Sequence, residues 1–150
     1  MRPAYLEVNI DAVRGNVVSL QRLVGPGCAV APVVKANAYG HGAVAVARAA
    51  LEAGGKFLCV AIVGEGVELR DAGIDAPILV LGPPDAEEAE AYLDYDLMPT
   101  ISDPGHCMLI AEAAGRAGKR AQVHVKLDTG MGRHGARPAV VEPLARLLCA

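Results

Sequence analysis

Short apolar segments alternate with helix-like segments along almost the whole chain, and this alternation constrains the fold more than any other feature. Five segments are typical of strands: 28–36, 57–63, 77–82, 97–101 and 122–128. Six segments have helical periodicity or strong helix formers: 11–24, 42–55, 65–73, 85–96, 102–118 and 137–150. Apolar strands separated by single helices indicate a parallel sheet, because each crossover helix covers one face of the sheet. The pattern therefore predicts an α/β protein.

Local signals refine some of these boundaries. Asp11 has the residue type of an N-cap for the first helix, and Ser102 or Asp103 has it for the helix at 102–118. Pro99 has no backbone amide to donate, so it weakens the strand expected at 97–101.

Two architectures use this repeat, the open doubly wound sheet and the closed (β/α)₈ barrel. The first strand-to-helix turn reads ANAYGHG, 36–42, and lacks the G-x-G-x-x-G pattern of dinucleotide-binding sheets. The barrel is therefore favoured. A complete barrel needs eight units and about 250 residues, whereas this sequence has five strands and stops within its last expected helix. We expect residues 1–150 to form one barrel domain that is incomplete at its C-terminus.

Composition excludes several classes of function. The formal net charge is -3, with no basic cluster, which argues against a nucleic-acid partner. No apolar run reaches the roughly 18 residues of a membrane span, and the first residues do not resemble a signal peptide, so we expect a soluble cytoplasmic protein. The widely spaced cysteines are expected to be reduced core residues: Cys28, Cys59, Cys107 and Cys149.

Lys35 follows an apolar run in VVKANAYGHG, 33–42, where a strand of a barrel would end. An ordinary lysine there would extend its amine to solvent. However, Tyr39 supplies a nearby hydroxyl, and Gly40 and Gly42 would let backbone amides approach a ligand at the start of the next helix. A desolvated lysine loses its proton more easily, and the neutral amine can form a Schiff base. This stretch therefore fits an aldehyde cofactor that carries a phosphate.

The second informative stretch is VHVKLDTGMGRHG, 123–135. Alternation along a strand would direct His124, Lys126 and Asp128 into the barrel, opposite the apolar side chains that face the helices. The Gly-rich turn would then bring Arg133 close to the strand end. A structural interpretation is also open: an interior Lys126–Asp128 ion pair and a solvent-facing Arg133.

The remaining polar features have simpler interpretations. His41 fits capping or loop packing, while His106 and His124 fit half-buried positions and His134 lies in a loop. No cluster of residues has metal-ligand spacing. The acidic segment 85–96 is typical of a solvated helix face.

VVKANAYGHG and VHVKLDTGMGRHG together resemble the two N-terminal signatures of the alanine racemases, and GIDAPILVLG and LMPTIS are similar to that family as well. Other pyridoxal phosphate barrels, such as diaminopimelate and ornithine decarboxylases, share a V-K-A-N core but not the AYGHG that follows. The resemblance implies an N-terminal (β/α)₈ barrel and a C-terminal β-domain, of which this chain would hold the first five barrel units.

The resemblance also implies roles for individual residues. Lys35 would form the Schiff base with pyridoxal 5'-phosphate and act as one of two catalytic bases. Tyr39 would contact the cofactor phosphate, and Leu81 would line the cofactor ring. Arg133 would lie near the phenolic oxygen of the cofactor and the substrate carboxylate. Lys126 matches a lysine that is carboxylated in many members, and a carbamate there would supply an anion for Arg133.

The implied reaction is the interconversion of L-alanine and D-alanine, which supplies D-alanine for peptidoglycan. The second base would be a tyrosine from the C-terminal domain of the other subunit of a homodimer, and no position of this chain matches it. Residues 1–150 alone are therefore expected to be inactive. Three alternatives stay open: a racemase of another amino acid such as serine, a pyridoxal phosphate-binding barrel without activity, and an inactive or regulatory fragment that acts through dimer contacts.

Overall fold

A single parallel sheet organises the chain in the computed structural model, which describes residues 4–148. Its strands lie side by side in the order of the sequence: β1 (Leu58–Val60), β2 (Ile78–Val80), β3 (Leu97–Ile101) and β4 (His124–Val125). All three strand pairs are parallel. A doubly wound sheet reverses its strand order at a switch point, whereas a barrel adds each strand beside the last. The observed order is therefore that of a barrel.

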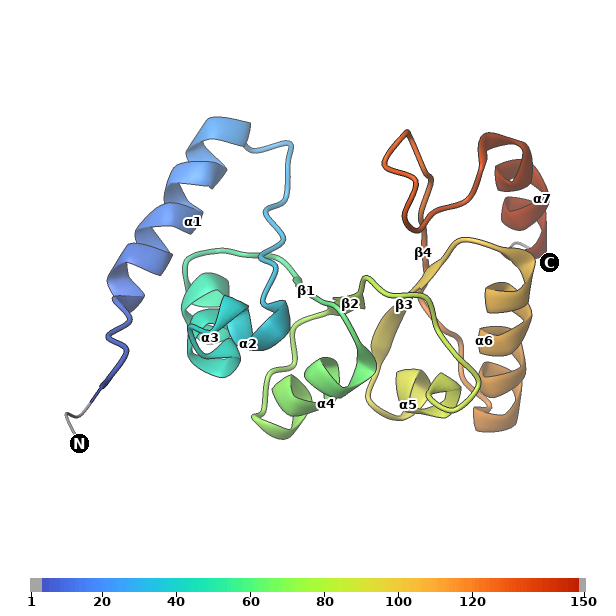
Figure 1. The fold of residues 1–150 in the computed structure, drawn as a ribbon, viewed down its shortest axis with the longest axis horizontal. Helices are drawn as coiled ribbons and strands as arrows, with labels where there is room; N and C mark the ends of the chain where they lie inside the picture. Colours follow the sequence, from blue (N-terminus) through green and yellow to red (C-terminus); the bar gives the residue numbers. More distant parts are fainter. Residues whose placement is uncertain (1–3, 149–150) are drawn as a thin grey trace.

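Helices connect the strands and cover the sheet. They are α1 (Ile10–Val24), α2 (Lys35–Tyr39), α3 (Ala43–Glu52), α4 (Val63–Asp71), α5 (Ala89–Asp94), α6 (Pro104–Ala117) and α7 (Pro138–Leu148). Figure 1 shows α3, α4, α5 and α6 along one side of the sheet, with α1 beside α3 at one end and α7 beside α6 at the other. This single outer layer of helices is the arrangement that a (β/α) barrel requires.

The core lies between the strands and this helical layer. Leu58, Val60, Ile78 and Val80 are at most 1% exposed, and they alternate with residues on the opposite face of the sheet. The register pairs Ile101 with Val125 and therefore puts Val125 on the helix-facing side. Burial of these branched side chains is the main source of stability for such a sheet.

The predicted strand at 28–36 is only partly regular. Hydrogen bonds join its middle to β1, since the amide of Cys59 donates to the carbonyl of Pro32 (2.9 Å) and the amide of Val34 donates to the carbonyl of Cys59 (2.9 Å). Only the Val33–Cys59 pair meets the geometry of a bridge. Pro32 has no amide to donate, which explains part of this irregularity. The segment nevertheless occupies the place of a first strand beside β1.

Several predicted boundaries were wrong by a few residues. The N-cap of α1 is Asn9, whose Oδ1 accepts from the amide of Ala12 (3.0 Å), and Asp11 lies inside the first turn. The last predicted strand, 122–128, is reduced to β4, and the helix predicted at 85–96 begins only at Ala89. The Asp103 cap is confirmed, because its carboxylate accepts from the amide of His106 (3.0 Å).

Pro99 does not prevent β3 from forming, although it was expected to weaken this strand. The pairing of β3 with β4 begins only at Thr100, so Pro99 lies before the part that is bonded to β4. The hydroxyl of Thr100 also donates to the carbonyl of Val80 (2.6 Å), a side-chain link between β3 and β2.

The cysteine prediction holds in part. Cys59 and Cys107 are buried free thiols, and burial raises the pKa of both. Cys28 is exposed, so its assignment to the core was wrong, because the Gly-Pro-Gly bend before it leaves it outside the sheet. Cys149 lies outside the described residues. Between residues 4 and 148, no helix has the length and apolar character needed to cross a membrane.

Candidate functional site

Lys35 begins a left-handed helical turn, where a simple strand end was expected. The four residues after it all have positive φ: Ala36 (51°), Asn37 (53°), Ala38 (50°) and Tyr39 (54°). L-residues reach this region only at a cost of roughly 1–2 kcal/mol each. Such strain persists where the surroundings over-determine the backbone, and it concentrates at functional sites. The turn α2 therefore indicates that Lys35 lies in a candidate functional site.

The turn is closed by its own hydrogen bonds. The amide of Gly40 donates to the carbonyl of Ala36 (3.0 Å), and that of Gly42 donates to the carbonyl of Asn37 (3.0 Å). The Asn37 side chain accepts from the amide of Ala43 (2.7 Å) at the start of α3. The amides of Gly40 and Gly42 are therefore both bonded within the chain. His41 packs in the same turn, its Nδ1 lying 2.8 Å from the carbonyl of Ala38.

A cavity of about 380 Å³ opens at the carboxyl ends of the strands. Its walls come from the turn after the first strand segment, from the loops after β1 and β2, and from the segment after β4. The lining residues are Lys35, Ala61, Ile62, Leu81, Gly82, Pro83, Lys126, Arg133 and His134. Four of the five predicted site residues therefore meet here, although they are far apart in the sequence. Ligands of barrel proteins bind at this end of the strands.

The electrostatics of the cavity favour an anion. Lys35, Lys126 and Arg133 contribute basic groups and His134 contributes an imidazole, whereas no carboxylate is present among the lining residues. Cavities lined by one sign of charge concentrate ligands of the opposite sign. Apolar side chains such as Ile62 form the rest of the wall. This combination suits a flat organic ligand that carries a phosphate or carboxylate.

Tyr39, the fifth predicted residue, lies beside the cavity and does not line it. The Nζ atom of Lys35 is 5.9 Å from the centre of the Tyr39 ring, within the range of a cation–π contact. Tyr39 is 62% exposed. The structure therefore brings Tyr39 next to Lys35 but leaves most of the residue accessible to solvent.

The loop after β4 is folded around Asp128. The Asp128 carboxylate accepts from the amides of Gly130 (2.9 Å) and Gly132 (3.0 Å), and these bonds lower the pKa of Asp128. The amide of Ala136 donates to the carbonyl of Lys126 (2.7 Å) and closes the base of the loop. The alternative Lys126–Asp128 ion pair does not form. Asp128 instead shapes the loop that carries Arg133 into the cavity wall.

Glu65 is a site-forming residue that the sequence interpretation missed. Its carboxylate accepts from the amide of Ala36 (2.6 Å) in the left-handed turn and from the amide of Ala61 (2.7 Å) after β1. A glutamate at the third position of a helix commonly bonds back to the amides before that helix. That signal predicts the bond to the amide of the N-cap residue Ile62 (3.4 Å), next to Ala61, but the bond to Ala36 spans 29 residues and has no local signature.

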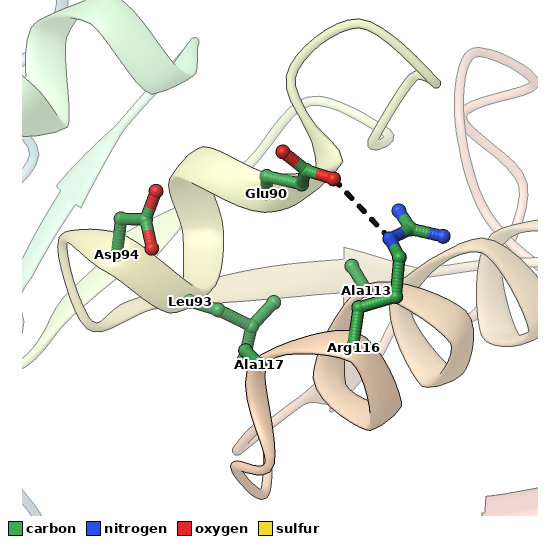
Figure 2. Close-up of a pocket in the computed structure, with 6 residues that line it drawn as sticks. All are labelled: Glu90, Leu93, Asp94, Ala113, Arg116 and Ala117. Atoms are coloured by element: carbon green, nitrogen blue, oxygen red, sulfur yellow. Dashed lines mark hydrogen bonds and ion pairs between the residues drawn. The ribbon is translucent and has the colours of Figure 1, made fainter.

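A second depression, of about 220 Å³, lies between α5 and α6 on the outer helical layer. Figure 2 shows Glu90 of α5 paired there with Arg116 of α6 (Oε1 to Nε 3.2 Å). Both side chains are more than half exposed, so the pair contributes little to stability. The depression belongs to the packing of two helices, and it shares no lining residue with the cavity at the strand ends.

The fold and the site together define a class of protein: a (β/α)-barrel chain with a lysine-bearing, anion-attracting cavity at the carboxyl ends of its strands. The family model for the alanine racemase N-terminal domain matches residues 8–150. The chain therefore belongs to the alanine racemase family and forms part of the barrel of that family.

Individual relatives agree with this assignment. The alanine racemase of Symbiobacterium thermophilum is 49% identical over 148 residues, which are 99% of this chain and 39% of that protein. The alanine racemase of Carboxydothermus hydrogenoformans is 47% identical over 90% of this chain and 36% of its own length. The chain thus spans less than two fifths of the length of these curated relatives.

Solved structures show the same fold. The crystal structure of alanine racemase from E. faecalis superposes with a TM-score of 0.87 at 35% identity, over 93% of this chain and 38% of that one. Alanine racemase of Clostridium difficile 630 gives a TM-score of 0.89 at 37% identity, over 93% and 37% of the two chains.

Proposed function

We propose that this chain forms part of a pyridoxal 5'-phosphate-dependent racemase that interconverts L-alanine and D-alanine. The observation that carries the proposal is the convergence of Lys35, Lys126 and Arg133 on one cavity at the strand ends, in a chain of the alanine racemase family. The relatives are alanine racemases, which supports alanine as the substrate.

The residues of the cavity fit this cofactor. An aldehyde requires an amine within the cavity, which Lys35 supplies, and a phosphorylated ring requires both positive charge and an apolar wall. Leu81 is half-buried in that wall, on the loop after β2. Tyr39 lies beside Lys35 and is largely exposed, and its hydroxyl would donate to a phosphate oxygen. When bound, pyridoxal phosphate withdraws electrons from the substrate Cα and so acidifies its proton.

The side chains of the cavity have two proposed roles, binding and proton transfer. Lys35 would hold the cofactor through its amine, and the same amine would remove or return the Cα proton on one face of the substrate. Arg133 binds the substrate carboxylate, because a guanidinium matches a carboxylate in geometry as well as charge. Racemisation also needs a base on the opposite face, and we propose that a tyrosine of the partner subunit in a homodimer supplies it. We further propose that the enzyme acts in the cytoplasm and supplies D-alanine for peptidoglycan.

The test is Lys35→Ala in the full-length protein, with Lys56→Ala as the matched control. Lys56 is an exposed lysine just before β1 and does not line the cavity. After incubation with pyridoxal phosphate and reduction with borohydride, we expect the cofactor on the peptide that contains Lys35, in the wild type and in Lys56→Ala. Lys35→Ala should lose both this label and alanine racemisation. Full racemase activity in Lys35→Ala would refute the proposal.

We also propose that Lys126 is carboxylated. Within residues 4–148 neither Lys126 nor Arg133 is paired with a carboxylate, although both line the same cavity. The neutral amine of Lys126 would add to carbon dioxide and release a proton, and the resulting carbamate would provide the anion that orients Arg133. Carbon-13 NMR in labelled bicarbonate should show a carbamate signal that is absent from Lys126→Ala. A free amine at Lys126 under these conditions would contradict this assignment.

A further inference from the structure

We infer that Glu65 is a positioning residue, whose carboxylate fixes the strained turn of Lys35 against the next two strand-end loops. Glu65 lies in the first turn of α4, and it accepts with both oxygens. Oε1 accepts from the amide of Ala36 (2.6 Å), and Oε2 accepts from the amide of Ala61 (2.7 Å). Short bonds of this kind to a charged acceptor are among the stronger hydrogen bonds in proteins.

The bond to Ala36 acts at the point where the backbone becomes left-handed. Ala36 is the first of the four residues with positive φ and directly follows Lys35. Ala36 is exposed, so water could satisfy its amide if Glu65 were absent. The Glu65 carboxylate is therefore not needed to satisfy a buried hydrogen-bond donor. Its effect is to restrain a conformation that the residues themselves disfavour.

The same carboxylate reaches a third loop through Ala61. While the amide of Ala61 donates to Glu65, its carbonyl accepts from the amide of Gly82 (3.0 Å) after β2. A Cβ atom at Gly82 would lie 2.6 Å from that carbonyl oxygen, so this close approach requires glycine. The turn of Lys35 and the loops after β1 and β2 are thus linked in one chain of hydrogen bonds.

Each of these linked segments contributes to the wall of the cavity. Lys35 comes from the first, Ala61 and Ile62 from the second, and Leu81 and Gly82 from the third. The position of the Lys35 amine relative to the apolar wall therefore depends on Glu65, although Glu65 does not itself line the cavity. A small displacement of a reacting group is sufficient to lower a rate by orders of magnitude.

Two substitutions distinguish the positioning role of Glu65 from a general contribution to the stability of the fold. Glu65→Ala removes both acceptors. Glu65→Gln keeps the size of the side chain, but it offers one carbonyl oxygen and turns an NH₂ group toward the second amide. Glu68→Gln is the matched control, since Glu68 lies one turn later on the exposed face of α4. All three variants are made in the full-length protein.

The first measurement is hydrogen–deuterium exchange of the Ala36 amide, compared with amides of β2 as internal controls. We expect exchange at Ala36 to be about tenfold faster, or more, in both Glu65 variants. Glu68→Gln and the β2 amides should remain at wild-type rates. Unchanged exchange at Ala36 in Glu65→Ala and Glu65→Gln overturns the inference, whatever reaction the protein catalyses.

The second measurement rests on the proposed function. The rate at which pyridoxal phosphate and borohydride label Lys35 should fall about tenfold in Glu65→Gln relative to the labelling of Lys56. Faster exchange at Ala36 with unchanged labelling of Lys35 would refute the positioning role. If the wild type itself is not labelled at Lys35, the proposed function fails, and the exchange measurement alone decides whether Glu65 holds the turn.

Discussion

At the scale of single residues, the left-handed turn from Ala36 to Tyr39 is the least ordinary part of the chain. The residue types do not predict this conformation, because none of the four residues is glycine. Asn tolerates positive φ better than most residues, and Asn37 also caps α3. The conformation is therefore held by bonds from outside the four residues, notably those to Glu65 and to the start of α3.

This conformation can be tested with Ala36→Gly. Glycine in an ordinary helix destabilises a protein by roughly 0.5–1 kcal/mol relative to alanine. At Ala36 the left-handed strain of about 1–2 kcal/mol would be relieved at the same time. We expect the free energy of unfolding to stay constant or rise by up to about 1 kcal/mol, measured by urea denaturation.

Ala45→Gly is the control for that experiment, because Ala45 is exposed in the regular helix α3. It should lower the free energy of unfolding by roughly 0.5–1 kcal/mol. A similar loss in Ala36→Gly would show that Ala36 is not held in the left-handed region in solution.

The sequence was sufficient to place the site but not to describe its geometry. Lys35 and Arg133 were expected near strand ends, Lys126 on the interior side of a strand and Leu81 beside the cofactor ring, and in the structure all four line one cavity. Parallel strands align their carboxyl ends, so strand order alone brings these residues together. Glu65 could not be predicted in its full role, because its bond to Ala36 depends on the three-dimensional approach of two loops.

At the scale of elements, the order of helices and strands was predictable and their ends were not. Apolar runs such as 122–128 mark where a strand passes through the core, but pairing with a neighbour decides how much of the run becomes regular. In this run only His124 and Val125 pair with β3. Residues 126–128 instead join the base of the loop around Asp128, through hydrogen bonds that the spacing of residue types does not reveal.

Helix α5 gives a prediction for alkaline pH. Tyr92 is 2% exposed, and burial, aided by the nearby Glu88 and Asp85 carboxylates, raises the pKa of Tyr92 well above its ordinary value. In the unfolded chain this tyrosine ionises near pH ~10, while the folded protein keeps the proton. The unfolded state therefore binds fewer protons above this pH, and the free energy of unfolding falls as the pH rises.

Tyr92→Phe should remove this contribution while retaining a buried ring. We expect its stability at pH 7 to lie within about 1 kcal/mol of the wild type, and its loss of stability above pH ~10 to be smaller. Thermal unfolding at a series of pH values measures the stability at pH 7 and its loss at alkaline pH. Tyr95→Phe, at a tyrosine that is 37% exposed, serves as the control and should follow the wild-type curve. Identical alkaline curves for wild type and Tyr92→Phe would contradict the assignment.

At the scale of the whole molecule, consecutive strand order explains why distant residues share one site. Each strand lies beside the one before it, so the loops after successive strands form a continuous rim. The cavity draws on the turn after the first strand segment, two following loops and the segment after β4. A barrel can therefore assemble a charged cavity from residues that are far apart in the sequence.

The proposed two-base reaction leads to a prediction for residues 1–150 expressed alone. Only Lys35 is proposed as a base in this chain, and proton return to the opposite face of Cα requires a second one. We expect no conversion of L-alanine to D-alanine above background, measured by enzymatic assay of D-alanine. The full-length protein at the same concentration is the control. Turnover by residues 1–150 at the rate of that control would show that the second base is not needed or lies in this chain.

The cationic cavity has a consequence for folding as well as for binding. In the absence of a ligand and of the proposed carbamate at Lys126, the basic groups of Lys35, Lys126 and Arg133 repel one another across a shared space, which opposes compaction of that end of the sheet. An anion that binds only the folded chain stabilises it by mass action, by about 2.7 kcal/mol at a free concentration one hundred times its dissociation constant. Under the proposed function, pyridoxal phosphate would therefore raise the fraction of the protein that is folded as well as complete its site.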